Sequence, residues 1–366
     1  MRTTDVRVRR ATTALAAGRP VVLTDDAAAK GYLAFAAEAA TATLVAFAVR
    51  HTSGYLRVAL PATECERLHL PPMCRGDGDR PAAAHRVTVD WHGTGTGISA
   101  TDRARTIAAL AAGESEASDF RRPGHVVPVQ VAAGGVLARR GAAEAAVDLA
   151  RMAGRRPAAA LSEIVSRAHP AAMADGAELI EFADRHRLAL LSIDDIAEHR
   201  RRTEPQVVRT AEAVLPTPLG ASRVIGFRDV HAGGEHLVVF IGAADPDVPM
   251  PLHIHLECLT GDVFGSTDCR CGDELDTALA TMRARDTGML VYLRPSAAVR
   301  ACGLFDRDEP AAERMSEITA WILRDLGVHS VRLSDDAPGL GLVMFGAIRE
   351  HGLNVTAPIP ALAAAG

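Results

Sequence analysis

The chain has 366 residues, of which 48% are hydrophobic, 23% charged and only 4% aromatic, and its formal net charge is −5. The length favours two domains, and the composition is that of a globular protein with aliphatic cores. The negative charge argues against nucleic-acid binding, and the lack of a long apolar run argues against a signal peptide or membrane span. We therefore expect a cytoplasmic protein.

In the first half, short β-branched runs alternate with alanine-rich helical patterns. The predicted strands are Val21–Leu23, Leu56–Ala59, Arg86–Val89, Val126–Gln130, Leu161–Val165 and Ala189–Ile193. The predicted helices are Ala34–Arg50, Asp102–Ala112, Ala143–Ala153 and Ala177–His186. This alternation predicts an α/β domain over residues 1–203, in which helices pack on a mixed sheet.

The second half begins after a charged, proline-containing segment, His199–Pro216, which predicts an interdomain linker. The strands predicted beyond it are Val224–Phe227, His236–Ile241, Leu252–His255 and Leu290–Leu293. Helices are predicted at Glu274–Arg285 and Ala311–Leu326, and the tail Pro358–Gly366 is expected to be disordered. Residues 204–366 are thus expected to form an α+β domain.

Three of the six cysteines, Cys258, Cys269 and Cys271, lie close together in the sequence. Such near neighbours rarely form a useful disulfide, and thiolates are preferred zinc ligands. The cluster therefore predicts one zinc ion per chain. Its fourth coordination position is either open to water, as in a catalytic site, or closed by His253 or His255. Three cysteines are interpreted as ordinary core or surface residues: Cys65, Cys74 and Cys302.

The segment around this cluster is similar to the zinc loop of GTP cyclohydrolase II. Residues 255–266 read HLECLTGDVFGS and residues 269–272 read CRCG, and the resemblance extends over roughly residues 206–360. In that family a zinc-bound water attacks C8 of guanine, the imidazole ring opens and formate leaves, while an arginine assists the loss of pyrophosphate.

Carried over residue by residue, the resemblance implies roles for several side chains. Arg314 corresponds to the catalytic arginine, and Glu257 is a candidate for orienting the metal-bound water. Substrate contacts are expected from His253, His255 and Arg294. The implied zinc ligands are Cys258, Cys269 and Cys271.

The first half resembles 3,4-dihydroxy-2-butanone 4-phosphate synthase. The matching stretches include VRHTSGY at residues 49–55, TGISATDRARTI at 96–107 and SDFRRPGHV at 118–126. Together the two halves resemble the bifunctional fusion of bacterial riboflavin synthesis, a family that also implies a homodimer formed through the first domain. Four retained residues could still outline a polar or anion-binding pocket: Thr96, His125, Arg139 and Glu163.

Both halves depart from their families at the sites. The acidic loop D-D-E-D-R-E-N-E-G-D of the synthases is replaced by the shorter Asp25–Tyr32, and the histidine of G-H-T-E-A is Ala142. The cysteine that follows T-S-G-Y in that family is Arg57 here. Magnesium binding needs oxygen ligands, so neither magnesium nor synthase activity is expected.

In the second half, the motif R-Q-E-G-R-G-I-G that reads the guanine edge becomes Arg294–Val299, and Asp335 and Asp336 stand where L-T-N-N-P-x-K has neutral residues. A like-charge pair at ~4 Å costs about 4 kcal/mol at an effective dielectric of ~20, which opposes a triphosphate. Three functions stay open. The first is zinc-dependent opening of a purine-like or related heterocycle. The second is a non-catalytic paralogue with structural zinc that partners or regulates flavin synthesis, and the third is an active bifunctional enzyme.

Overall fold

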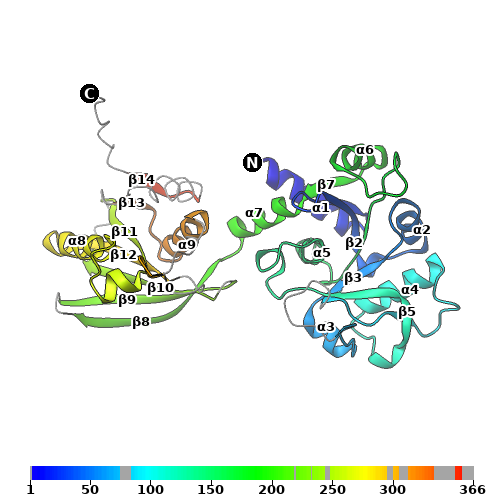
Figure 1. Ribbon diagram of the computed structural model, residues 1–366, viewed down its shortest axis with the longest axis horizontal. Helices are drawn as coiled ribbons and strands as arrows, with labels where there is room; N and C mark the ends of the chain where they lie inside the picture. The colour runs from blue at the N-terminus through cyan, green and yellow to red at the C-terminus, as the bar shows by residue number, and fades with distance from the viewer. Residues whose placement is uncertain are drawn as a thin grey trace. The chain divides into compact units, whose positions relative to one another are not determined.

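The computed structural model describes residues 2–74, 84–217, 220–231, 233–243, 248–294, 300–304, 312–333 and 351–356. The chain divides into two units, Met1–Arg200 and Arg201–Gly366, and each is built on its own seven-stranded sheet (Figure 1). The expected α/β domain followed by an α+β domain is confirmed. Within the described ranges, no helix has the length and apolar character needed to cross a bilayer.

The sheet of the first unit has the strand order β4-β5-β3-β6-β2-β1-β7 and mixes parallel with antiparallel pairs. Its strands are β1 Val21–Asp25, β2 Lys30–Ala36, β3 Arg57–Leu60, β4 Val89–Trp91, β5 Phe120–Gln130, β6 Ala159–Glu163 and β7 Ala189–Ser192. The α-helices are α1 Thr3–Ala16, α2 Ala42–His51, α3 Ala62–Arg67, α4 Ala100–Ala111, α5 Ala142–Met152, α6 Gly176–His186 and α7 Ile193–Thr203. Single 3-10 turns are η1 Ala37–Ala39, η3 Ala117–Asp119 and η4 Gly135–Leu137.

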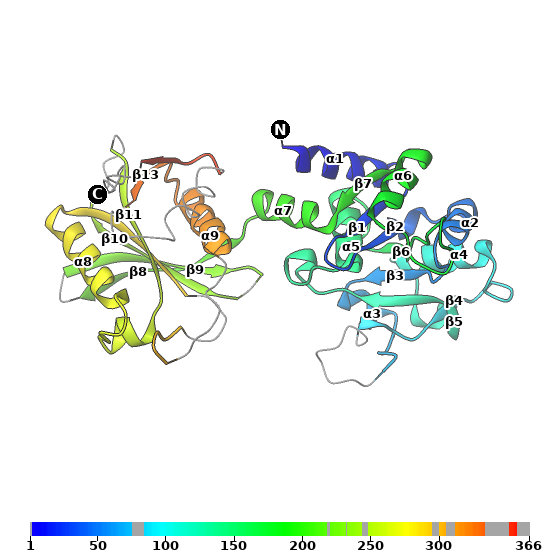
Figure 2. The same cartoon turned by 45° about the horizontal axis from the view of Figure 1, so that its top comes forward.

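Two apolar cores cover this sheet, one on each face. Buried residues of α1, α5 and α7, among them Leu15, Leu149 and Ile196, form one core. Residues of α2, α4 and α6, such as Val45 and Ile107, form the other, and Figure 2 shows α5 and α2 on different sides of the strands. Apolar area removed from water stabilises a fold by about 25 cal/mol per Å², so two-sided burial supports the three-layer arrangement.

Two predicted elements differ from the structure, the first of them only in its N-terminal part. The helix predicted at Ala34–Arg50 is the end of β2 followed by η1 and α2. Because β2 lies between β1 and β6 and is covered on both faces, its sequence is continuously apolar and carries no strand alternation. The linker predicted at His199–Pro216 is the end of α7 followed by β8. Most residues of β8 are exposed, which explains the polar composition that suggested a linker.

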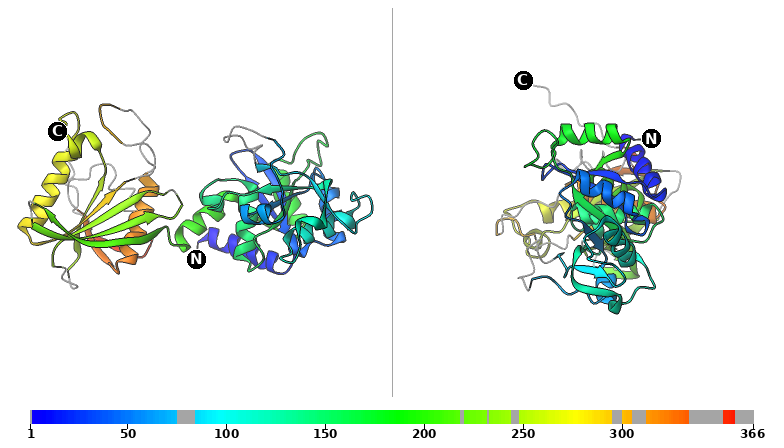
Figure 3. Two further views of the ribbon diagram at one scale, coloured as in Figure 1. Left: turned by 90° about the horizontal axis from the view of Figure 1, so that it is seen from below. Right: turned by 90° about the vertical axis from the view of Figure 1, so that its right-hand side faces the viewer.

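The second unit has the strand order β14-β13-β11-β12-β10-β9-β8. Its strands are β8 Val207–Thr217, β9 Gly220–Asp229, β10 Glu235–Gly242, β11 Met250–Leu256, β12 Thr287–Leu293, β13 Ser330–Leu333 and β14 Asn354–Thr356. Its helices are the one-turn π-helix η5 Leu259–Val263, α8 Cys271–Ala284 and α9 Ala312–Asp325. Apolar residues of α9, orange in Figure 3, share one core with the sheet.

The pairing of β11 with β12 positions the candidate site. The two strands are parallel and in register from Leu252 opposite Met289 to Leu256 opposite Leu293. Their carboxyl ends therefore meet at one edge of the sheet, and the segments that follow them, which carry Cys258 and Arg294, start side by side.

Candidate metal centre

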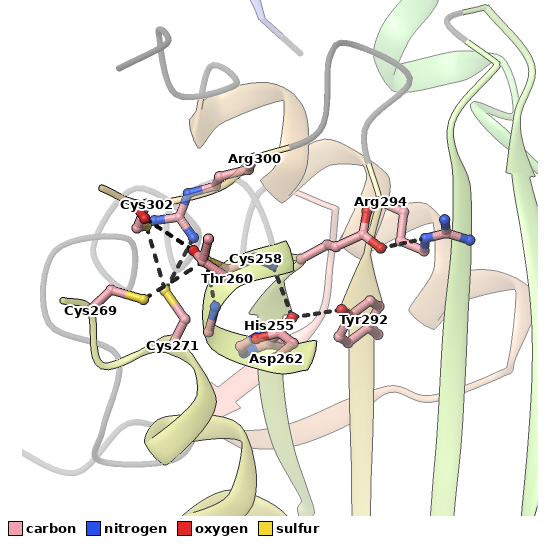
Figure 4. A network of polar contacts seen from close by, with 12 residues as sticks. His255, Cys258, Thr260, Asp262, Cys269, Cys271, Tyr292, Arg294, Arg300 and Cys302 are labelled. Atoms are coloured by element: carbon pink, nitrogen blue, oxygen red, sulfur yellow. Dashed lines mark hydrogen bonds and ion pairs between the residues drawn. The ribbon is translucent and has the colours of Figure 1, made fainter. Parts of the chain in front are cut away.

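Four cysteine sulfurs meet beyond the carboxyl ends of β11 and β12. Cys258 precedes η5, Cys269 and Cys271 lie at the start of α8, and Cys302 is in a turn after β12. The four sulfurs lie within 4.8 Å of one another, with 3.8 Å between Cys258 and Cys269 and 4.0 Å between Cys271 and Cys302 (Figure 4). In a tetrahedral zinc site with bonds of about 2.3 Å, the sulfurs are about 3.8 Å apart. The donor set and spacing therefore fit zinc.

Two glycines allow the loops that carry these sulfurs to approach closely. A Cβ atom on Gly261 would lie 2.9 Å from Cβ of Cys271 and 3.1 Å from the sulfur of Cys269. A Cβ atom on Gly272 would lie 2.5 Å from the carbonyl oxygen of Gly261. Larger residues at either position would push η5 away from the start of α8 and separate the sulfurs.

Hydrogen bonds and burial shift the pKa values of the clustered cysteine thiols. Burial raises the pKa of Cys258, but hydrogen bonds with Thr260, Cys302 and Gly261 outweigh it and bring this pKa to about 6. Burial raises the pKa of Cys271 and of Cys302. Since neighbouring thiolates repel one another, the group can ionise completely only when a metal ion compensates the charge.

A buried polar network supports the metal loop from the side of the sheet. The Asp262 carboxylate lies 3.0 Å from Nε2 of His255 and accepts hydrogen bonds from Tyr292 Oη at 2.6 Å and the Cys258 backbone N–H at 2.9 Å. Burial opposes ionisation, but these hydrogen bonds lower the pKa of Asp262. His255 is thus engaged by a carboxylate, and His253 beside it is only 3% exposed.

Glu257 and Arg294 follow β11 and β12 and form an ion pair of 2.9 Å between Oε1 and Nε. Both side chains are partly exposed. The backbone N–H of Arg294 also donates to Nδ1 of His236 on β10. The structure therefore brings these two expected site residues into contact with each other at the ends of β11 and β12.

Arg314, the arginine expected to be catalytic, binds the side chains of Asp229 and Gln206. It lies on α9, where Nη2 is 2.9 and 2.8 Å from the two carboxylate oxygens of Asp229 and Nη1 donates to Gln206 at 2.9 Å. Asp229 and Gln206 are both buried. These contacts connect α9 with the end of β9, and the catalytic role expected for Arg314 stays a prediction.

The four polar residues expected to outline a pocket in the first unit contact different partners. Glu163 lies 3.9 Å from Lys30 and 3.7 Å from Arg57. His125 pairs with Asp90 at 2.7 Å, and the exposed Thr96 precedes Gly97, which packs against that pair.

The fourth residue, Arg139, makes its contacts at the start of α5. Its Nε donates to the buried Glu144 at 2.8 Å. The interactions found in the described residues thus do not join these four side chains into one pocket. Asp335, Asp336 and Ser296–Val299 lie outside the described residues.

Comparison with known proteins covers both units. The family model for 3,4-dihydroxy-2-butanone 4-phosphate synthase matches residues 9–199, and that for GTP cyclohydrolase II matches residues 208–360. Riboflavin biosynthesis proteins RibBA from Rhodococcus erythropolis and Nocardia farcinica are 44% and 43% identical, over 96% of this chain and 88% and 90% of theirs. The chain belongs to the RibBA family of riboflavin biosynthesis proteins.

Solved structures agree with this assignment. RibBX, a two-domain 3,4-dihydroxy-2-butanone 4-phosphate synthase from A. baumannii, is 27% identical with a TM-score of 0.70, over 96% of this chain and 99% of its own. A 3,4-dihydroxy-2-butanone 4-phosphate synthase in complex with two magnesium ions is 41% identical with a TM-score of 0.51, over 54% of this chain and 97% of its own.

These findings confirm the resemblance of both halves and the connection with the riboflavin pathway and its small-molecule substrates. The names of the RibBA relatives give no support to the interpretation as a divergent paralogue. Sequence reasoning missed Cys302, which it treated as an ordinary residue. The available signal was a fourth cysteine within the same unit as the other three.

Proposed function

We propose that this RibBA-family chain is a zinc-dependent hydrolase of the cyclohydrolase type, and that its first unit does not act as a magnesium-dependent synthase. The observation that carries the proposal is the convergence of Cys258, Cys269 and Cys271 at spacings that suit zinc. When water occupies its fourth position, a zinc ion supplies hydroxide near neutral pH, because it lowers the pKa of that water.

We propose roles for Glu257 and Arg294, which follow the strands β11 and β12 that lead to the metal site. Glu257 directly precedes Cys258 and its side chain is partly open to solvent, and we assign it the role of accepting and holding a proton during hydrolysis. Arg294 pairs with it across the ends of β11 and β12 and fixes its orientation. The guanidinium of Arg294 is also placed to meet a carbonyl or anionic group of the substrate.

The substrate we propose is a purine-like or related heterocycle without a triphosphate. Arg314 is engaged by Asp229 and Gln206, so it is not available to assist cleavage of a phosphoanhydride. The replacement of neutral residues by Asp335 and Asp336 adds negative charge in a segment that belongs to the nucleotide site of the family. Both features disfavour GTP.

In the first unit, Lys30 and Arg57 lie beside Glu163, and Arg57 stands where the synthase family has a cysteine. Two positive groups within 4 Å of this carboxylate oppose a divalent cation there. We place the functional boundary after Thr203, the last residue of α7, and propose a cytoplasmic homodimer formed through the first unit. Light scattering of the purified chain tests the dimer.

The test is an assay of the zinc-loaded chain for formate with GTP, simpler guanine compounds and other heterocycles. Zinc-dependent formate from a compound without a triphosphate, lost in Cys269→Ala, supports the proposal. Formate from GTP together with 3,4-dihydroxy-2-butanone 4-phosphate from a sugar phosphate and magnesium would instead establish the active bifunctional enzyme.

A second candidate function is a zinc centre without catalysis, in a protein that partners or regulates flavin synthesis. The observation that favours it is the position of Cys302, whose sulfur lies among those of the other three cysteines. It predicts stoichiometric zinc and no formate from any compound in the same assay.

A further inference from the structure

We infer that Cys302 is the fourth zinc ligand of this chain, so that the resting metal is held by four thiolates and carries no water. The inference rests on the zinc site of the proposed function, and it adds which group occupies the fourth coordination position of the metal. Its first support is geometric. The sulfur of Cys302 lies 4.0 Å from that of Cys271 and within 4.8 Å of the other two. Sulfurs in a tetrahedral zinc site are about 3.8 Å apart.

The second support is that Cys302 is held in place by the metal loop itself. The hydroxyl of Thr260 donates to the carbonyl oxygen of Cys302 at 3.1 Å. Two residues earlier, the carbonyl of Arg300 accepts from the backbone N–H of Leu259 at 2.9 Å. The residue between them, Ala301, is fully buried. The same few residues that follow Cys258 therefore fix the backbone on both sides of Cys302.

The turn that carries Cys302 is also well defined. The N–H of Leu304 donates to the carbonyl of Ala301 at 3.1 Å, and Gly303 has a φ of +79°, which glycine adopts without strain. A Cβ atom on Gly303 would lie 3.3 Å from a carboxylate oxygen of Asp268, so this turn packs against the segment just before Cys269.

The third support is charge. Four thiolates around a divalent cation leave a net negative charge, which neighbouring donors must balance. The guanidinium of Arg300 donates to the sulfur of Cys271 at 3.4 Å, and the backbone N–H of Gly261 donates to that of Cys258 at 3.4 Å. These donors stabilise a centre made of sulfur alone.

A centre with four thiolates has a chemical consequence. Closed tetrahedral zinc sites are structural, whereas catalytic ones keep a position for water. In this chain, hydrolysis would require water to take the place of the Cys302 thiolate. The residue thus decides between the two functions proposed above, because it occupies the position where the nucleophile would form.

X-ray absorption at the zinc edge of the full-length wild-type chain counts the ligands directly. We expect four sulfurs at about 2.3 Å. Three sulfurs with one nitrogen or oxygen would overturn the inference while leaving the proposed function standing. Absence of stoichiometric zinc would refute the metal assignment on which both rest.

Variants give an independent readout. In cobalt-substituted protein, Cys302→Ser should lower the thiolate-to-metal absorption by about a quarter, since one of four thiolates is lost, and release zinc to a chelator at least ~10-fold faster. Cys74→Ser, an exposed cysteine of the first unit, serves as the control and should change neither. If Cys302→Ser fails to fold, Cys302→His retains a ligand and should shift the cobalt bands. Unchanged spectra in both variants would refute the role of Cys302.

Discussion

Nη2 of Arg314 lies 2.9 and 2.8 Å from the two carboxylate oxygens of Asp229, a side chain that is only 2% exposed. The arginine thereby neutralises a buried charge that has no access to water. A buried carboxylate that loses its charged partner is strongly destabilising, because its charge is left without compensation in a medium of low dielectric. This contact connects α9 to the end of β9, and we expect the stability of the second unit to depend on it.

Arg314→Ala is therefore expected to lower the free energy of unfolding of the second unit by about 3–5 kcal/mol. Urea unfolding of the zinc-loaded chain measures this. Glu212→Gln is the control, because it removes the exposed partner of Arg223 in the same sheet and should change stability by less than ~1 kcal/mol. The double variant Asp229→Ala/Arg314→Ala should lose less than the sum of the single changes. Equal stability of Arg314→Ala and wild type would contradict the structural role.

Magnesium should leave the thermal stability of the first unit unchanged. Lys30 and Arg57 lie 3.9 and 3.7 Å from Glu163, and a unit charge pair at ~4 Å is worth about 4 kcal/mol at an effective dielectric of ~20. Thermal unfolding with millimolar magnesium chloride, compared with sodium chloride of equal ionic strength, tests this. A saturable rise in Tm that Glu163→Gln abolishes would show that a magnesium site survives.

Removal of zinc should destabilise the second unit and not the first. A ligand that binds only the folded state adds about 2.7 kcal/mol at a hundredfold excess over its Kd. A strong chelator and Cys269→Ala should therefore shift the same unfolding transition to lower temperature, while the transition of the first unit stays in place. The prediction would be contradicted if Cys269→Ala still bound stoichiometric zinc and its unfolding transition stayed at the wild-type temperature.

Patterns that are local in the sequence led to correct predictions. The amphipathic period of α4 and α6 arises from residues within one or two turns of one another, and Cys258, Cys269 and Cys271 lie within fourteen residues of the sequence. The strand β2 was not predicted, and its last residues, from Ala34, were assigned to a helix, because burial on both faces removes the alternation that identifies a strand.

Contacts between distant segments could not be predicted in this way. Cys302 is 31 residues from Cys271 and reaches it because β12 returns the chain to the edge where β11 ends. Asp229 is 85 residues from Arg314, and nothing in the spacing of the two residues indicates their pairing. The family resemblance assigned Arg314 to catalysis, and only the fold shows that Asp229 is its neighbour.

The last prediction concerns pH and His236. This residue is 1% exposed, its Nδ1 accepts from the N–H of Arg294 at 3.1 Å, and its Nε2 has no hydrogen-bond partner among the described residues. Burial lowers its pKa to about 4, with Arg314 and Arg294 acting in the same direction and Asp229 against them. The neutral ring is therefore the form that the folded state accepts.

Between the pKa of about 4 in the folded chain and the ordinary value of 6.5, the unfolded chain binds a proton that the folded chain does not. This contribution to stability is present above pH ~6.5 and is lost as the pH falls towards ~4, by about 3 kcal/mol in total. His236→Asn keeps an acceptor for the Arg294 N–H without an ionisable ring, so its stability should fall less steeply over this range. Urea midpoints measured for both proteins across the window decide the question. Because acid-induced loss of zinc affects both alike, parallel curves would mean that His236 does not titrate as its burial requires.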